Sequence, residues 1–258
     1  MLGFIVSPAK KMNVLEGPPY PSTQPEHLAR TRLLFEALRA LSLEQAQELW
    51  HCSDRLAQTN YDRFHRVNLD RDLTAAVIAY EGIQYQHLAA QVLDEDGLDY
   101  LDRHLRILSG FYGVLRPTDG VVPYRLEMQA KLCMPDGPSG QQTADLYAFW
   151  GDTLASSLAR DYATIVNIAS VEYAKAVTPH LAQFGTRMLT CLFGSVRASD
   201  GKLLQRSTEA KAARGTFMRW CAESQVEDVQ DMRGFSERGY RLDASRSDEQ
   251  TLVFVRDA

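Results

Sequence analysis

Short apolar runs separated by helical segments constrain the fold of this chain more than any other feature. Buried strands are predicted at residues 2–6, 75–80, 163–168, 188–196 and 251–255. Helical spacing of apolar residues fills much of the chain between these runs, and Ser42-x-x-Gln45 is a capping box at one helix start. Strands dispersed among helices predict an α/β (α+β mixed) fold, with a mixed β-sheet and surrounding helices.

The length limits the number of domains. A chain of 258 residues is long for one domain and short for two, and neither an internal repeat nor a linker divides it. The apolar fraction of 45% is sufficient for a large core and excludes disorder as the main state. We predict a single domain over residues 1–258 and leave open a two-lobed form around a basic cleft.

Three features predict the compartment. No apolar run approaches the roughly 20 residues that cross a bilayer, so no membrane association is expected. The first lysines follow the N-terminal apolar run, which is the reverse of a secretory signal. The four cysteines are far apart and form no C-x-x-C pair, as is typical of reduced thiols. We therefore expect a cytoplasmic protein.

An arginine-rich stretch surrounds a glycine turn in residues 103–128. Gly110 and Gly113 allow the backbone to approach a ligand, and exposed N–H groups in such a turn can form an anion-binding concavity. A tight turn with merely solvated arginines is the alternative. The net charge of −5 argues against a protein that is basic over its whole surface.

Further cationic and polar residues follow strand ends or lie on predicted helices. Arginine and lysine on one wall of a cleft suit phosphate, through ionic attraction and the fork geometry of arginine, although each residue alone also fits a solvated charge. The predicted DNA/phosphate-binding set is Lys10, Lys11, Arg106, Gly110, Gly113, Arg116, Arg125, Lys211 and Arg214.

Motifs for other chemistries are missing. The six histidines have no metal-ligand spacing, so no metal site is predicted. The chain contains neither a P-loop nor the G-x-S-x-G elbow of serine hydrolases. No cofactor is predicted.

Several multi-residue motifs resemble those of the YaaA family in the same order. They are Ser7-Pro-Ala-Lys10, the block 108–117, the block 123–128, Phe149-Trp-Gly-Asp152, the block 167–173 and the block 211–215. The resemblance runs nearly end to end. It implies a bacterial cytoplasmic protein that protects against hydrogen peroxide and limits intracellular iron, with a positively charged cleft in a YaaA-type α/β fold.

The resemblance also implies a helix-hairpin-helix element linked to binding of double-stranded DNA. Here that element would comprise the helix before His104, the 108–113 hairpin and the segment after Val114. Such elements bind the duplex backbone rather than its sequence.

Three positions depart from the family pattern. Ile83 stands where the family has an acidic residue, Ala212 replaces one of two lysines, and Glu209 replaces an aromatic residue. One cation fewer and one anion more should weaken a phosphate-binding wall, and Lys11 should compensate in part.

Three functional hypotheses follow. The first is a peroxide-stress protein that binds double-stranded DNA through backbone phosphates, limits iron-dependent oxidative damage and needs no obligate protein partner. The second is an enzyme acting on a nucleotide or other small phosphorylated ligand in the same cleft, with Lys10 as nucleophile or clamp and Asp152, Ser170 or Glu172 as acid or base. The third, direct iron sequestration, ranks lower because metal-ligand spacing is missing.

Overall fold

A central eight-stranded sheet organises the structure, a computed structural model that describes residues 1–134 and 142–256. Its strand order is β11-β12-β9-β8-β1-β5-β6, and β10 pairs with β9. Strands β1, β5, β8, β9 and β12 run parallel, whereas β6, β10 and β11 are antiparallel to their neighbours. The strands are β1 (Leu2–Val6), β5 (Leu105–Ser109), β6 (Gly113–Leu115), β8 (Thr164–Asn167), β9 (Arg187–Val196), β10 (Leu203–Leu204), β11 (Arg241–Leu242) and β12 (Thr251–Arg256). The predicted mixed sheet is confirmed.

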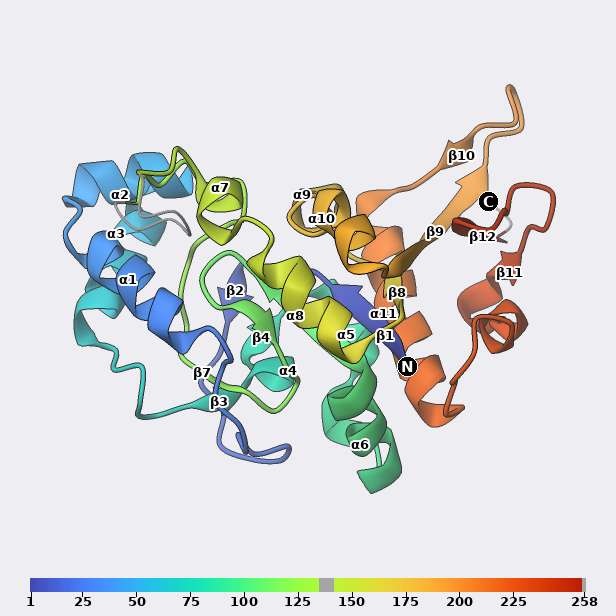
Figure 1. Cartoon of the computed structure of the whole chain (residues 1–258), viewed down its shortest axis with the longest axis horizontal. Helices are drawn as coiled ribbons and strands as arrows, with labels where there is room; N and C mark the ends of the chain where they lie inside the picture. The colour runs from blue at the N-terminus through green and yellow to red at the C-terminus, as the bar shows by residue number, and fades with distance from the viewer. Residues whose placement is uncertain (135–141, 257–258) are drawn as a thin grey trace.

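Helices cover both faces of this sheet. Successive residues of a strand point to opposite faces. The Phe4 ring lies 6.3 Å from that of Phe217 on α11 (Ser207–Glu223), whereas Gly3 faces Tyr162 at the end of α8 (Thr153–Asp161). A Cβ at Gly3 would lie 2.4 Å from the Tyr162 ring, so the missing side chain lets α8 sit close to the sheet. Helices α11 and α8 therefore lie on opposite faces (Figure 1).

The other elements around the sheet are short. Helix α6 (Glu95–His104) packs on β1, β5 and α11, and its first turn is capped by the Asp94 side chain. Helix α9 (Val171–Ala174) follows β8, and α10 (Thr178–Leu181) contacts α8 and β9. Single 3-10 turns occur at η1 (Ala90–Val92), η2 (Ala182–Phe184), η3 (Asp231–Gly234) and η4 (Glu237–Gly239).

Most of the remaining elements lie beside the sheet, to the left in Figure 1, whereas α5 (Ile83–Leu88) lies near its centre, against α11. They include two separate two-stranded sheets, β2–β4 and β3–β7. The elements are β2 (Lys11–Met12), α1 (Leu28–Arg39), α2 (Leu43–Trp50), α3 (Asp54–Arg66), β3 (Thr74–Ala75), α4 (Ala76–Ala79), β4 (Tyr80–Glu81), α5 (Ile83–Leu88), β7 (Gly120–Val121) and α7 (Leu146–Trp150). Rings of Phe35, Phe64 and Phe111 contact one another, so the hydrophobic core is continuous from α1 and α3 to β5.

Four of the five predicted strands are confirmed, and the prediction for 75–80 is wrong. There, one turn of helix, α4, separates the two-residue strands β3 and β4. Every residue from Thr74 to Tyr80 is buried. Periodicity alone cannot separate a buried strand from a buried helical turn, which explains the error.

The helix-hairpin-helix expectation is not confirmed. Helix α6 leads directly into β5, and residues 113–115 form β6, antiparallel to β5. A β-hairpin therefore occupies the place of the expected element. Among the residues that the structure describes, no helix has both the length and the apolar composition required to span a bilayer.

Candidate functional site

The order of the parallel strands reverses direction at β1. The chain passes from β1 to β5 on one side, and then to β8, which pairs with β1 on its other side. It continues outward to β9 and β12. In open α/β sheets, ligands bind beyond the carboxyl ends of the strands at such a reversal. Ser7 and Ser170 follow the ends of β1 and β8, so the topology places a candidate site beside these serines.

A cavity of about 630 Å³ lies at this position, and we call it the switch-point cavity. Segments far apart in the sequence form its walls: the loop after β1, the start of α5, residues 124–127, the start of α9 and the first half of α11. Seven of its lining residues belong to the predicted sets for phosphate binding or catalysis: Lys10, Lys11, Arg125, Ser170, Glu172, Lys211 and Arg214.

Hydrogen bonds among the loop after β1, the loop after β8 and α5 fix the part of the cavity around Ser7. The Ser170 N–H donates to the Ser7 hydroxyl at 2.8 Å, and the two hydroxyl oxygens are 3.2 Å apart. The Tyr85 hydroxyl donates to the Ser7 carbonyl oxygen at 2.9 Å. The ends of β1 and β8 and the start of α5 are thereby held in one arrangement.

Helix α11 forms one wall of the cavity because it packs unusually close to α5. Ser207, Lys211 and Arg214 recur about one turn apart and line the cavity together. A Cβ at Gly215 would lie 2.0 Å from the Gln84 carbonyl oxygen, which explains why this position has no side chain. The close contact brings Lys211 and Arg214 against the wall formed by α5.

Arg214 is a half-buried cation without a counter-charge in the described part of the chain. Its Nε is buried and has no hydrogen-bond partner there. Loss of hydration on burial lowers the pKa of the Arg214 guanidinium. A desolvated charge is unfavourable unless another group compensates it, and such groups are concentrated at functional sites.

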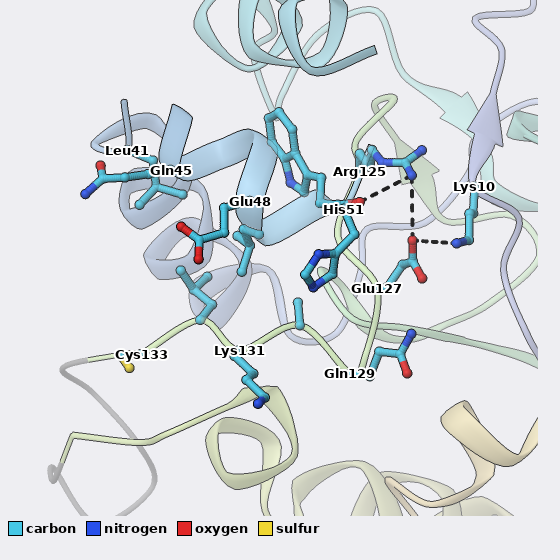
Figure 2. A pocket seen from close by; sticks show the side chains of 14 residues that line it. Lys10, Leu41, Gln45, Glu48, His51, Arg125, Glu127, Gln129, Lys131 and Cys133 are labelled. Carbon is cyan, nitrogen blue, oxygen red and sulfur yellow. Dashed lines mark hydrogen bonds and ion pairs between the residues drawn. The ribbon is translucent and has the colours of Figure 1, made fainter. Parts of the chain in front are cut away.

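The cations that residues 10–11 and 124–127 contribute to the cavity are already paired. The Lys10 Nζ lies 2.8 Å from the Glu127 carboxylate, and an Arg125 Nη lies 3.7 Å from the same oxygen. Figure 2 shows Lys10 and Arg125 on either side of this carboxylate. The Lys11 Nζ lies 2.6 Å from Glu81. These ion pairs reduce the attraction that this wall exerts on an anion.

Glu172 supplies a carboxyl group that retains its proton more readily than usual. Burial raises the pKa of Glu172, although its Oε1 accepts a hydrogen bond from the Gln129 N–H at 3.3 Å. The side chain is half-buried at the cavity, near the Ser7 and Ser170 hydroxyls that also line it. The site therefore contains a carboxyl group suited to proton transfer.

Arg106 and Arg116 lie elsewhere, at a separate cavity of about 460 Å³. Arg106 is buried; its Nη1 donates to the carbonyl oxygens of Asp102 and Leu105, and Nη2 lies 3.7 Å from Asp161. Its interactions are internal to the fold. Arg116 is exposed and lies 3.9 Å from the Asp102 carboxylate. The structure therefore does not place these two arginines with the Lys10 wall.

Gly110 and Gly113 lie in the core. Phe111 and Tyr112 between them are almost fully buried, and the N–H groups of both donate to the Ser109 hydroxyl, at 3.1 and 2.9 Å. These N–H groups cannot bind an external anion, so the predicted anion-binding turn is replaced by a structural one.

Asp152 also lies apart from the cavity lining. It is exposed at the start of α8, where its carboxylate accepts a hydrogen bond from the Gln183 side chain at 3.3 Å. Of the four residues predicted for catalysis, Lys10, Ser170 and Glu172 share the switch-point cavity.

The sequence prediction missed several residues of the site. Ser207 could have been found, because it precedes Lys211 by one helical turn. The long-range partners Glu81, Gln84 and Tyr85 have no comparable signal in the sequence.

A larger adjacent cavity of about 890 Å³ shares Lys10, Arg125 and Glu127 with the site (Figure 2). Within residues 1–134 and 142–256, no group of three or more His, Cys, Asp or Glu side chains is placed to hold a metal ion.

Comparisons with known proteins cover nearly the whole chain. A family profile described as "Peroxide stress protein YaaA" matches residues 2–246. The chain is 45% identical over 253 residues to a UPF0246 protein of Lactiplantibacillus plantarum, covering 98% of each chain. It is 43% identical over 254 residues to a UPF0246 protein of Pediococcus pentosaceus, again covering 98% of each. For a UPF0246 protein of Lachnoclostridium phytofermentans, the identity is 40% over 98% of this chain and 96% of the relative.

Proposed function

Because the chain belongs to the peroxide stress protein YaaA family, we propose that it acts in the cytoplasm by binding a small phosphorylated ligand in the switch-point cavity. Family membership supports the stress-response role. The observation that carries the ligand class is Arg214, a half-buried cation on the cavity wall without a partner among the described residues. Lys211 on the same wall is exposed and adds a second positive charge.

The shape of the site favours a small ligand. Its volume of about 630 Å³ falls within the range of small-molecule pockets, roughly 300–1,000 Å³. Tyr85, Tyr124 and Tyr173 line it, and burial raises the pKa of each, so they remain neutral at physiological pH. Cations on one wall and aromatic rings on another suit a ligand with a phosphate and a flat, less polar part, such as a nucleotide.

A reaction on that ligand would use the polar residues of the same cavity. Lys10 would act as an electrostatic clamp once a phosphate competes for it with Glu127. Glu172, whose burial favours the protonated form, would act as the acid, with the Ser170 hydroxyl nearby.

Double-stranded DNA is a second candidate, favoured by the continuation of positive charge beyond the cavity. Lys10 and Arg125 also line the adjacent larger cavity, together with Lys131. Such a row of cations can follow a phosphate backbone without reading its sequence. Bound DNA would then be shielded from iron-dependent oxidative damage. The buried Gly110–Gly113 turn and the separate position of Arg116 weigh against this candidate.

Fluorescence anisotropy with a labelled ATP analogue and a labelled short duplex separates the two candidates. The measurements are made at low and near-physiological salt, with unlabelled ATP and pyrophosphate as competitors. We expect ATP analogue binding that pyrophosphate displaces, and weak duplex binding that ATP also displaces. Duplex binding that falls steeply with salt and ignores mononucleotides would instead establish the DNA candidate. Binding of neither probe would overturn the phosphate site.

A further inference from the structure

We infer that the Lys211–Arg214 face of α11 is a subsite for a terminal phosphate group, a monoester or pyrophosphate end, rather than for the diester phosphates of a duplex. This inference rests on the proposed phosphate-binding function. It identifies the part of the cavity that holds the phosphate, and it specifies a phosphate group with two negative charges.

The pairing of charges around the cavity leaves only the α11 wall for an incoming anion. The cavity is lined by five cations and three carboxylates: Lys10, Lys11, Arg125, Lys211, Arg214, Glu81, Glu127 and Glu172. Glu81 is paired with Lys11, and Glu127 with Lys10 and Arg125. Within the described residues, Lys211 and Arg214 have no such partner. Two uncompensated charges on one helix face match the two negative charges of a terminal phosphate.

The depth of Arg214 distinguishes a terminal phosphate from a backbone phosphate. Its Nε is buried while the side chain as a whole is half-buried in the cavity lining, so an anion meets the guanidinium from within the cavity. A terminal phosphate at the end of a small molecule can enter the cavity. A diester phosphate is part of the surface of a rigid, rod-shaped duplex, which is too wide to enter with it. A phosphate monoester carries nearly two charges and three acceptor oxygens at neutral pH, and a diester carries one charge. Arginine pairs with such a group through two parallel hydrogen bonds.

The start of α5, against which Gly215 packs, contributes Gly82, Ile83 and Gln84 to the cavity lining and no charged side chain. Gly215 holds the two walls together, because any side chain there would collide with the Gln84 carbonyl oxygen. The subsite therefore has a cationic wall from α11 and an uncharged wall from the start of α5.

An uncompensated, half-buried charge destabilises the unliganded protein, and this gives the subsite a distinctive test. The melting temperature Tm is measured by calorimetry, without phosphate and with inorganic phosphate, pyrophosphate or dimethyl phosphate. For Arg214→Met, we expect a Tm without phosphate about 2–4 °C above that of the wild type. We also expect the variant to lose the Tm increase that phosphate and pyrophosphate cause in the wild type. Dimethyl phosphate, a diester, should leave the Tm of both the wild type and Arg214→Met unchanged.

Arg219→Met is the matched control, since it removes the same charge from the same helix. Arg219 lies outside the cavity lining and forms an ion pair with Glu223 at 2.7 Å. We expect this variant to keep the full phosphate-dependent increase and to gain no stability. Lys211→Met, an exposed substitution, is a second variant that should reduce the phosphate-dependent increase even if Arg214→Met fails to fold.

The outcomes separate failure of the subsite from failure of the proposed function. A wild-type increase with pyrophosphate that persists in both Arg214→Met and Lys211→Met would overturn the subsite alone. An equal increase with dimethyl phosphate would do the same. A wild type that responds to none of these anions, and binds neither labelled ATP nor duplex, would overturn the phosphate-binding function itself.

Discussion

Glu26 illustrates at the residue scale how a local ion pair sets the response of this protein to acid. Both carboxylate oxygens of Glu26 accept hydrogen bonds from the Arg160 guanidinium at 3.0 Å, and one also accepts from the Ser157 hydroxyl at 2.9 Å. The hydrogen bond from Arg160 is the largest cause that lowers the pKa of Glu26 to about 2 from an ordinary value of 4.5. A carboxylate whose pKa is lower in the folded state stabilises that state only while it is ionised.

Glu26→Gln should therefore reduce the free energy of unfolding at pH 7 and have a smaller effect in acid. The stabilisation by Glu26 is fully present above about pH 4.5 and is lost as the pH falls toward about 2. Because the Glu26 side chain is 39% exposed, solvent screening limits the loss at pH 7 to about 1 kcal/mol or less. Urea unfolding at pH 7 and pH 3 measures this difference, with the exposed Glu36→Gln on α1 as control. An equal loss at both pH values would contradict the assignment.

The residue scale also shows which part of the site the sequence could predict. Lys10, Lys211 and Arg214 were identified because they follow a strand end or lie on a predicted helix, and all three line the cavity. The sequence could not predict which cations lack an acidic partner, because the partners Glu81 and Glu127 come from other segments of the chain. The position of Arg106 apart from this cavity could not be predicted for the same reason, because its acceptors, the Asp102 and Leu105 carbonyl oxygens, are brought to it only by the fold.

At the scale of elements, the contact between α11 and α5 positions the α11 wall of the cavity. Gly215→Ala would place a Cβ 2.0 Å from the Gln84 carbonyl oxygen, a backbone atom that cannot rotate away. The helices must separate, and we expect a loss of about 1–3 kcal/mol in the free energy of unfolding. The same displacement moves Arg214, so the Tm increase caused by pyrophosphate should also shrink.

Gly97→Ala on α6 is the matched control for this helix contact. A Cβ at Gly97 meets only side-chain atoms of Asp94 and Leu93, at 3.1 Å or more, so the neighbours can adjust. Alanine also has the higher helix propensity, by about 1 kcal/mol. Urea unfolding and calorimetry of both variants test the argument. A Gly215→Ala protein as stable and as responsive to pyrophosphate as wild type would refute the role of this contact.

Elements were predictable where local pattern and tertiary environment agree. The strands at 2–6 and 251–255 are apolar, short and buried, and both were predicted. The Gly110–Gly113 turn was predicted as an exposed ligand loop because glycines and arginines surround it. Phe111 and Tyr112 within the turn instead pack with Tyr124 in the core, at ring distances of 4.9 and 5.4 Å. Two aromatic residues inside a turn are a signal of burial that the surrounding charge obscured.

At the scale of the whole molecule, an acidic protein presents a local cationic site, and Glu127 limits the strength of that site. The net charge is −5, so the overall field repels anions weakly, and binding depends on local charge. Glu127 neutralises Lys10 and Arg125 at one side of the cavity. Its 18% exposure leaves this carboxylate less screened than a surface group.

Glu127→Gln should therefore increase the affinity for pyrophosphate, by roughly 2- to 5-fold, because two cations lose their internal partner. Glu249→Gln is the control: this exposed residue lies outside the cavity lining, and its substitution changes the net charge by the same single unit. Isothermal titration calorimetry at two salt concentrations compares both variants with the wild type. A gain in Glu127→Gln alone, largest at low salt, identifies the local ion pairs as the limit on affinity. An equal gain in both variants would assign the effect to net charge, and a loss in Glu127→Gln would mean that the carboxylate positions Lys10 and Arg125 for the ligand.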